Sequence, residues 1–337
     1  MKTIVCERPN KFIAAETEVP EPTDGEALVR IRRIGICGTD MHAYKGNQPF
    51  FEYPRILGHE LAGIVERIGD NAEGLKAGDQ VAVIPYLACG ECVACRKGKT
   101  NCCTGMQVLG VHLDGGMREF ISVKATNLIK TSGLTLDQSA VVEPLAIGAH
   151  AVRRAEPEPG EFALVIGAGP IGLGVMAFAK RRGARVIAMD INDERLAFCR
   201  MWAGAEHTVS ALQGAADKLA AITGGEFPTV VFDATGNKRS MEAAIGLCAH
   251  GGKLVYVGLV RSDIVFSDPE FHKRELTLLG SRNATQEDFD EVLAAVKGGA
   301  VDVEGYITHR SPFDETIGRF ETWLKPEAKV IKAMVEL

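Results

Sequence analysis

Apolar runs alternate with helical segments through the middle of the chain. The runs at 164–166, 185–189, 229–233 and 253–257 have the length and composition of buried strands. Segments of helical composition lie between them, at about 172–182, 195–203 and 241–248. This alternation predicts an α/β fold with a doubly wound parallel sheet.

The pattern is different near the two ends of the chain. Short β-type runs occur at 4–5, 12–13 and 27–31, separated by Pro20, Pro22 and Gly25. Such runs predict a small antiparallel sheet or the rim of a barrel. A further β-type run near 330–333 is compatible with a return of the tail to this first region.

A glycine-rich turn follows the first central apolar run. Gly167, Gly169 and Gly172 form Gly-x-Gly-x-x-Gly, which permits a tight turn, close approach of a pyrophosphate and close packing of helix on strand. The helix that follows offers free N–H groups to the phosphates. Asp190 ends the next run, where its carboxylate would bind the ribose hydroxyls and repel a 2′-phosphate. This favours NAD over NADP, and the alternative is a glycine-rich turn of some other α/β domain.

Composition narrows the class of protein. A chain of 337 residues with 46% hydrophobic residues is large enough for two cores. The net charge of −6, with acids and bases mixed, gives no basic patch for nucleic acid. No apolar run approaches the roughly 20 residues that span a membrane, and the first residues do not resemble a signal peptide. The nine cysteines cluster, which indicates metal binding in a reducing cytoplasm.

Four of these cysteines have the spacing of a structural metal site. Cys89, Cys92, Cys95 and Cys103 give C-x2-C-x2-C-x7-C, which suits a closed, tetrahedral zinc site in a loop-rich lobe. Cys102 competes with Cys103 as the fourth ligand. An iron–sulfur cluster is the competing metal, although its usual spacing has a shorter last gap, and a pair of disulfides is the remaining alternative.

A second set of candidate ligands is more dispersed. Cys37, His59 and Glu60 offer a thiolate, an imidazole and a carboxylate, a plausible catalytic zinc set with an open position. A buried Cys37 acting as a small hydrophobe is the alternative. Glu143 lies in an apolar stretch, where an unpaired carboxylate would be costly, and is either a fourth ligand or a first-turn acid of a helix.

The order of these motifs resembles the zinc-containing medium-chain dehydrogenase/reductase family over essentially the whole chain. Cys37, the Gly58-His59-Glu60 stretch, the four-cysteine lobe, Glu143-Pro144 and the Gly167 turn carry the resemblance. Within the family the chain is most similar to the polyol and sugar-acid branch, which includes sorbitol and threonine dehydrogenases. The segments 46–51, 81–86, 266–273 and 280–285 resemble the L-gulonate and L-galactonate 5-dehydrogenases of that branch.

The resemblance implies a GroES-like, partly β-barrel catalytic domain at 1–145 and 286–337, with a zinc lobe at about 86–106, and an inserted NAD-binding Rossmann domain at 146–285. It implies two zinc ions per chain: a catalytic ion on Cys37, His59, Glu60 and, directly or through water, Glu143, and a structural ion on the four cysteines of the lobe. The catalytic zinc would make an alcohol proton easier to remove, Thr39 and His42 would relay that proton, and NAD would take the hydride. For Thr39 and His42 the alternative is hydrogen bonding that only fixes their loop. The expected NAD contacts are Gly167, Gly169, Pro170, Ile171, Gly172, Asp190, Arg195, Thr235, Gly236, Gly258 and Leu259.

The substrate is expected to be a secondary alcohol, in first place the C5 hydroxyl of a hexonate. A sugar acid needs a cation, and Arg282 is the first candidate, followed by Lys273 and Arg118. Each of these cations has the alternative of a solvated surface charge, and Arg282 has the further alternative of a cofactor contact. Tyr44, Phe50 and Phe51 are candidate pocket walls, with plain packing as the alternative. The alternative substrates are a neutral polyol and threonine, and the alternative function is that of a dinucleotide-binding protein without catalysis. The resemblance also implies a homodimer or homotetramer.

Overall fold

A computed structural model describes residues 1–47 and 51–337 of the chain. The chain divides into two compact units, which we call unit 1 (Met1–Glu143 and Leu293–Leu337) and unit 2 (Pro144–Val292). The sequence led us to expect domain boundaries after residues 145 and 285. The two units of the structure are separated within helices α4 (Val142–Ala155) and α10 (Gln286–Lys297). None of the helices in the described ranges is long and apolar enough to cross a membrane.

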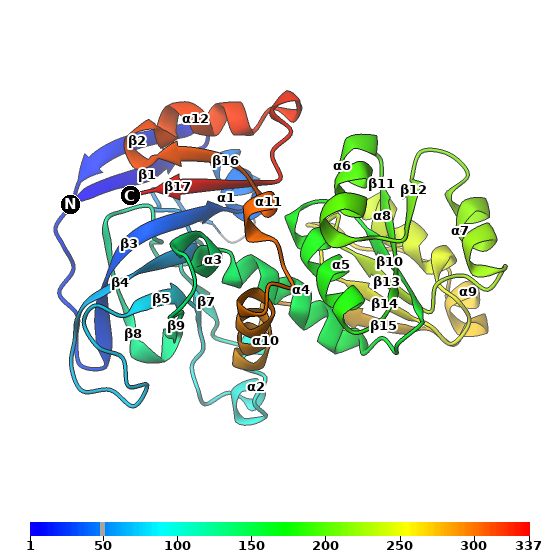
Figure 1. Cartoon of the computed structure of the whole chain (residues 1–337), viewed down its shortest axis with the longest axis horizontal. Coiled ribbons are helices and arrows are strands. Elements are labelled where there is room, and N and C mark those ends of the chain that lie inside the picture. The colour runs from blue at the N-terminus through cyan, green and yellow to red at the C-terminus, as the bar shows by residue number, and fades with distance from the viewer. Residues whose placement is uncertain (48–50) are drawn as a thin grey trace. The chain divides into compact units, whose positions relative to one another are not determined.

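Unit 1 is built on a 7-stranded sheet in the order β16-β17-β3-β4-β5-β9, with β8 paired to β3 (Figure 1). Two small two-stranded sheets, β1-β2 and β6-β7, accompany it. The strands are β1 (Lys2–Arg8), β2 (Lys11–Glu16), β3 (Glu26–Ile36), β4 (Glu60–Ile68), β5 (Gln80–Val83), β6 (Tyr86–Leu87), β7 (Gln107–Val108), β8 (Phe120–Lys124), β9 (Leu128–Lys130), β16 (Ile307–Pro312) and β17 (Lys332–Glu336). The helices are α1 (Gly38–Tyr44), α2 (Val93–Arg96), α3 (Leu136–Ala140), α11 (Val303–Tyr306) and α12 (Thr316–Trp323).

The C-terminal segment completes the sheet of unit 1. Strand β17 pairs antiparallel with β3, with Ala333 opposite Ile36, and Figure 1 shows the red β17 beside the blue β3. Buried side chains such as Ile31, Ile34 and Val335 belong to the core cluster of this unit. The return of the tail to the first region, which the sequence left open, is therefore observed.

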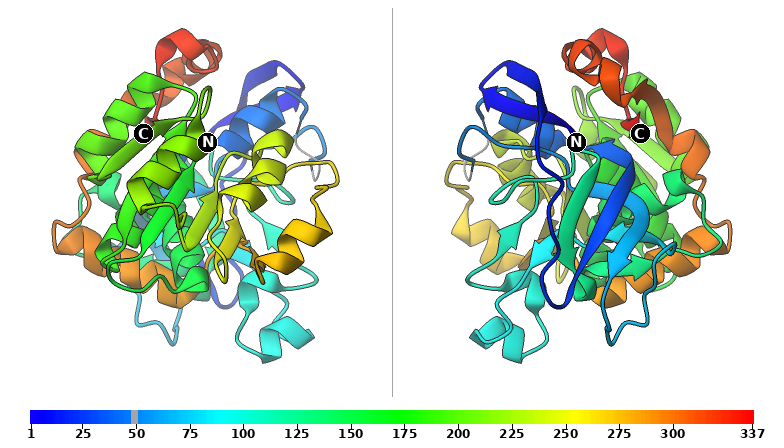
Figure 2. Two further views of the ribbon diagram at one scale, coloured as in Figure 1. Left: turned by 90° about the vertical axis from the view of Figure 1, so that its right-hand side faces the viewer. Right: turned by 90° about the vertical axis from the view of Figure 1, so that its left-hand side faces the viewer.

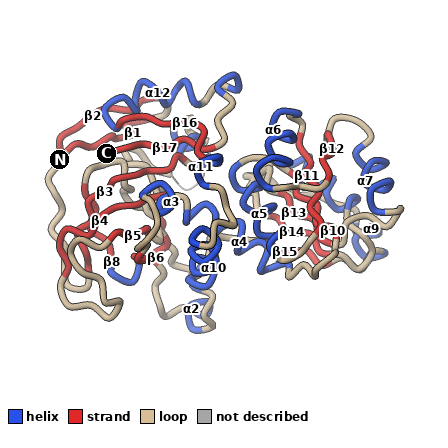
Figure 3. Tube along the Cα trace, viewed as in Figure 1, coloured by secondary structure: helices blue, strands red, loops and turns tan. Residues whose placement is uncertain are grey.

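Unit 2 is a 6-stranded parallel sheet in the order β12-β11-β10-β13-β14-β15. Helices lie on both of its faces (Figures 2 and 3). The strands are β10 (Phe162–Ile166), β11 (Arg185–Asp190), β12 (His207–Ser210), β13 (Val230–Asp233), β14 (Lys253–Tyr256) and β15 (Thr277–Gly280). The helices, besides most of α4 and the start of α10, are α5 (Pro170–Arg181), α6 (Asp193–Phe198), α7 (Ala215–Thr223), α8 (Lys238–Ala244) and α9 (Asp268–Lys273).

The central strands of unit 2 are apolar because they are buried on both faces. Ala163 to Ile166 of β10 and all of β13 are buried, because a parallel sheet has helices on both faces and its strands read as continuous apolar runs. The predicted doubly wound fold is confirmed. Chain order reverses between β10 and β13, and a crevice at such a switch point is where these sheets bind ligands.

Candidate active site and metal centres

The pairing of β3 with β4 brings three predicted ligands together. Gly35, near the end of β3, is directly opposite Glu60, the first residue of β4. A Cβ atom at position 35 would overlap Glu60 Oε2, so only glycine leaves room for this carboxylate. The ligand atoms of Cys37, His59 and Glu60 all lie within 4.8 Å of one another.

Thr39 and His42, which we expected in a loop, lie in helix α1. Cys37 is the N-cap of α1, and its backbone N–H donates to Asp40 Oδ2 at 2.9 Å. A carboxylate that reaches back to the cap in this way stabilises the first turn. Thr39 is half-buried in this helix, and His42 is exposed one turn later. The helix therefore leads from the ligand cluster to the surface of unit 1, as a proton relay would require.

Asp40 has a position that the sequence did not reveal. It is fully buried, and its Oδ1 accepts from the backbone N–H of Gly58 at 3.1 Å. The same oxygen is 3.7 Å from His59 Nδ1, too far for a hydrogen bond. Burial raises the pKa of Asp40. Asp40 thus connects the two chain segments that carry Cys37 and His59. The only signal in the sequence is an acid three residues after Cys37.

The residues of this cluster fit a zinc ion. His59 Nδ1 is buried and has no hydrogen-bond partner in the described part of the chain. Burial alone would lower the pKa of His59, but the negative charges of Asp40 and Cys37 outweigh it and raise that pKa well above its usual value. The surroundings therefore favour a cation. Sulfur, nitrogen and oxygen donors with one position left open are the ligand set of a catalytic zinc.

Lys332 is a second buried residue that the sequence did not indicate. Its Nζ lies 2.6 and 2.7 Å from the two carboxylate oxygens of Glu60 and 3.2 Å from Ile36 O. Lys332 and Glu60 are 1% and 0% exposed, so this is a fully desolvated ion pair. Burial lowers the pKa of Lys332, but Glu60 more than compensates and raises it above its usual value. In sequence Lys332 is one cation in a β-type run, with nothing to connect it to residue 60.

Of the two interpretations that the sequence left open for Glu143, the structure shows the first-turn acid of a helix. It lies in the first turn of α4, and it is 5% exposed, with its Oε1 accepting from the hydroxyl of Tyr86. Burial raises the pKa of Glu143 to about 7, while the charges of His59 and Glu60 act on it in opposite directions. Glu143 is thus a neighbour of the zinc-like cluster. It is not one of the three residues whose ligand atoms lie within 4.8 Å of one another.

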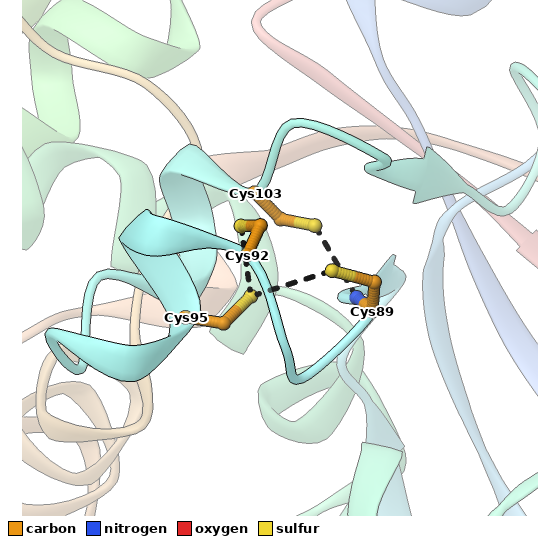
Figure 4. A group of neighbouring side chains, drawn as sticks. All are labelled: Cys89, Cys92, Cys95 and Cys103. Atoms are coloured by element: carbon orange, nitrogen blue, oxygen red, sulfur yellow. Dashed lines mark hydrogen bonds between the residues drawn. The ribbon is translucent and has the colours of Figure 1, made fainter.

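The four cysteines of the lobe converge on a common centre (Figure 4). The Cys95 sulfur lies 3.5 Å from that of Cys92 and 4.0 Å from that of Cys89, and Cys89 N donates to Cys103 Sγ at 3.2 Å. The fourth member is Cys103, whereas Cys102 is exposed and outside the group.

These cysteines are free thiols, as are all nine in the chain. Hydrogen bonds from the backbone N–H groups of Cys95 and Thr104 lower the pKa of Cys92 to about 5, which favours a thiolate. Helix α2 in the lobe has no buried residue, so a metal would replace the missing core. Four sulfurs within 4.8 Å of one another fit a structural zinc.

The glycine-rich turn has the geometry of a phosphate cradle. Gly167 has φ 99°, and a Cβ at position 172 would overlap the carbonyl oxygen of Gly167. A Cβ at Gly169 would meet nothing within 4 Å, so this residue borders open space at the N-terminus of α5. Asp190 Oδ2 accepts from the backbone N–H of Ala168 at 2.7 Å, which fixes the acid beside the turn. These residues fit a dinucleotide.

The neighbouring loops complete this edge of the sheet. Thr235 donates twice to the buried Asp233, through N at 2.9 Å and Oγ1 at 2.6 Å, and its methyl group is close to Gly167. A Cβ at position 258 would overlap the backbone nitrogen of Gly236. The predicted contacts Gly167, Thr235, Gly236 and Gly258 are therefore neighbours. Pro170 and Ile171 open α5, Arg195 lies half-buried in α6, and Leu259 is exposed.

Comparison with known proteins agrees with these sites. Residues 23–133 match the family of alcohol dehydrogenase GroES-like domains, and residues 170–298 match the zinc-binding dehydrogenases. L-Galactonate-5-dehydrogenase from Escherichia coli K12 is 44% identical, over 99% of this chain and 98% of its own. The chain belongs to the zinc-binding alcohol dehydrogenases.

Two further relatives of this zinc-binding alcohol dehydrogenase are informative. A 2-dehydro-3-deoxy-L-galactonate 5-dehydrogenase from Pseudoalteromonas atlantica is 33% identical over 96% of this chain and 95% of its own. A crystal structure of an alcohol dehydrogenase from E. coli CFT073, complexed with NADH, has a TM-score of 0.93 at 31% identity and covers 100% of this chain and 99% of its own. The predicted family, two-domain fold and enzyme class are confirmed, and the predicted cofactors agree with this family.

The substrate candidates are not gathered in one unit. Arg282 is exposed just after β15, and Lys273 is exposed beside Glu270 at 3.5 Å; both belong to unit 2. Arg118 is half-buried in unit 1, with its Nε unpartnered within the described ranges. Tyr44 is 4% exposed in the core, and its hydroxyl donates to Glu321 at 2.8 Å, so its ring is not an open pocket wall. Phe51 packs against the same core, and Phe50 lies outside the described residues.

Proposed function

We propose that the protein is an NAD-dependent zinc dehydrogenase that oxidises the C5 hydroxyl of a hexonate. L-Galactonate would give D-tagaturonate, and L-gulonate would give D-fructuronate. The observation that carries this proposal is the 44% identity, along nearly the whole chain, with an L-galactonate-5-dehydrogenase, together with an intact Cys37–His59–Glu60 cluster. A second relative that acts on an L-galactonate derivative supports the same substrate class.

The residues of unit 1 have distinct roles in this proposal. Cys37, His59 and Glu60 would hold the catalytic zinc, and Glu143 would contact it directly or through water. Asp40 fixes the two segments that carry Cys37 and His59. When bound, zinc supplies a Lewis acid and NAD a hydride acceptor. Thr39 would accept the alcohol proton and His42, one turn further along α1, would pass it to solvent. Four thiolates in the lobe would hold a second zinc.

The residues of unit 2 select the cofactor. The free N–H groups at the start of α5 would bind the pyrophosphate, close to Gly169. Asp190 accepts hydrogen bonds from the backbone N–H groups of Ala168 and Asn192, at 2.7 and 2.9 Å, so its carboxylate is fixed where it would meet the ribose. A fixed negative charge there disfavours a 2′-phosphate and favours NAD over NADP.

We also propose a homodimer or homotetramer and a cytoplasmic location. Strand β15 is the last strand of its sheet among the described residues, and Leu278 on it is exposed. The segment between β14 and β15 carries three more exposed apolar residues, Leu259, Val265 and Phe266. An unpaired apolar edge of this kind favours pairing with a second copy. All nine cysteine side chains are free thiols, and they would stay reduced in the cytoplasm.

The proposal is tested by following NADH formation with a panel of hexonates, neutral polyols and threonine, with and without a zinc chelator. We expect turnover of L-galactonate or L-gulonate, loss of turnover with chelator, and little activity with NADP. An Arg282→Gln variant should then raise KM for the hexonate and leave NAD affinity unchanged.

Turnover of sorbitol or threonine alone would overturn the hexonate substrate while leaving the zinc–NAD chemistry intact. Zinc binding without turnover of any alcohol would instead support a dinucleotide-binding protein without catalysis. The panel therefore separates all of the alternatives considered for the sequence.

A further inference from the structure

Two carboxylates beside the proposed zinc centre are held in different ways. Lys332 contacts both oxygens of Glu60, at 2.6 and 2.7 Å, so that carboxylate is neutralised symmetrically. Glu143 receives one hydrogen bond in the described part of the chain, from the hydroxyl of Tyr86 to Oε1. The hydroxyl of Tyr86 contacts Oε1 alone, and no hydrogen bond to Oε2 is found among the described residues. The difference makes Tyr86 the group that sets the orientation of Glu143.

Tyr86 is itself rigidly placed. It belongs to strand β6, which pairs with β7 through Tyr86–Val108. The side chain of Asn127 donates to the carbonyl oxygen of Tyr86 at 3.0 Å and to that of Ile84 at 2.9 Å. Tyr86 is 9% exposed, and Glu143 is 5% exposed. A buried phenol on an anchored strand holds its acceptor with little freedom, as residues that support a metal ligand usually do.

From this geometry we infer that Tyr86 is a positioning residue of the catalytic centre: it holds Glu143 by Oε1 and thereby presents Oε2 to the zinc or to its bound water. The inference rests on the proposed zinc centre but not on the identity of the substrate. Partners of this kind typically contribute 10–100-fold to metal affinity or activity. Tyr86 acts through Glu143, so its contribution depends on the carboxylate being present.

The chain offers a matched control. Tyr44 also donates its hydroxyl to a carboxylate, that of Glu321 at 2.8 Å, but within the aromatic cluster of Phe12 and Phe320. Tyr44→Phe therefore removes the same kind of hydrogen bond away from the metal cluster. The four-cysteine lobe is an internal control, because its zinc has none of these residues as ligands.

The experiment measures zinc bound per chain by mass spectrometry while a chelator is titrated, for the wild type, Y86F, Y44F, E143Q and Y86F/E143Q. We expect Y86F to release one zinc at a chelator concentration about 10–100-fold lower than the wild type needs, and to retain the zinc of the lobe. Y44F should behave as the wild type. E143Q should show a loss similar to that of Y86F, and the double variant should lose no more than E143Q alone.

Cobalt substitution gives a second readout that a purely structural role would not move. The visible absorption of cobalt at the Cys37–His59 site should change in Y86F and remain unchanged in Y44F. The inference would be overturned if Y86F retained zinc as strongly as the wild type does. If Y86F failed to fold, the same result with E143Q would overturn it. Additive losses of zinc affinity in the double variant would also overturn it. If the zinc measurements came out as expected but the wild-type protein did not turn over a hexonate, only the proposed substrate would be contradicted.

Discussion

At the scale of single residues, the buried pair Lys332–Glu60 is the main feature of unit 1. Taking two charges out of water is costly, and their attraction repays that cost only with close geometry. Here the ammonium touches both carboxylate oxygens and also donates to Ile36 O at 3.2 Å. The pair joins the C-terminal strand β17 to the start of β4, so one side chain connects the tail of the chain to the metal cluster.

Lys332→Met should be strongly destabilising, because it leaves both buried oxygens of Glu60 without their ammonium partner. We expect a loss of about 3–5 kcal/mol in the free energy of unfolding, measured by denaturant titration of fully zinc-loaded protein. Lys2→Met is the control, since Lys2 and Asp314 form an exposed pair at 2.7 Å, and its midpoint should not change. Equal midpoints for the two variants would show that Glu60 does not need Lys332.

At the scale of elements, helices α4 and α10 are clamped together within unit 2. Asp288, in the first turn of α10, is fully buried and accepts from Arg153 Nε at 2.6 Å, and His150 Nδ1 lies 2.8 Å from its other oxygen. Thr285, at the start of α10, donates to the same carboxylate through its backbone N–H at 2.8 Å. These are the two helices in which the chain passes from one unit to the other.

This clamp predicts a dependence of stability on pH. Burial alone would raise the pKa of Asp288, but hydrogen bonds from His150 and Arg153 outweigh burial and hold it well below its usual range. Because the unfolded carboxyl binds a proton near pH 4 and the folded one does not, the stabilisation is complete above that pH and declines as the pH falls below it. Asp288→Asn should therefore cost ~3 kcal/mol at pH 7 and progressively less towards pH 3.

The measurement is the midpoint of denaturant unfolding for wild type and Asp288→Asn at a series of pH values. Glu287→Gln, an exposed neighbour of Arg153 at 3.1 Å, is the control and should follow the wild type at each pH. If the difference in unfolding midpoint between Asp288→Asn and the wild type stayed constant from pH 7 to pH 3, the stabilising role of the ionised Asp288 would be contradicted.

At the scale of the whole molecule, the proposed homo-oligomer would form through the edge strand of the parallel sheet. Within residues 1–47 and 51–337, strand β15 pairs with β14 alone, and Leu278 on it is 37% exposed. Val265 and Phe266, in the loop before α9, are 67% and 37% exposed. Apolar side chains beside unpaired backbone groups are typical of an interface rather than of a solvated edge.

Light scattering should therefore give a molar mass that is a multiple of 36.2 kDa. Leu278→Lys should shift that mass towards the monomer, because a buried, unpaired ammonium opposes pairing of the edge. Met201→Lys is the control, since Met201 is 76% exposed on unit 2 away from β15, and it should leave the mass unchanged. A monomeric wild type would refute the proposed oligomer.

Local sequence determined much of this protein. The apolar runs defined the strands of unit 2, because strands buried on both faces need no alternation. The glycine spacing defined the turn before α5, because Gly172 packs against Gly167 with no room for a side chain. The cysteine spacing defined the lobe, since ligands close in sequence can meet around one ion. These signals also carried the family resemblance.

Only the tertiary structure decided the rest, because it depends on residues far apart in the chain. Lys332 and Glu60 are 272 positions apart, and Tyr86 and Glu143 are 57 apart, so no local pattern connects them. Burial then changes what these side chains do: the same Lys, Tyr or Asp in water would be an ordinary surface group. The sequence determined which chemical groups were available; the fold decided which of them face one another without water, and that determines their charge, partners and roles.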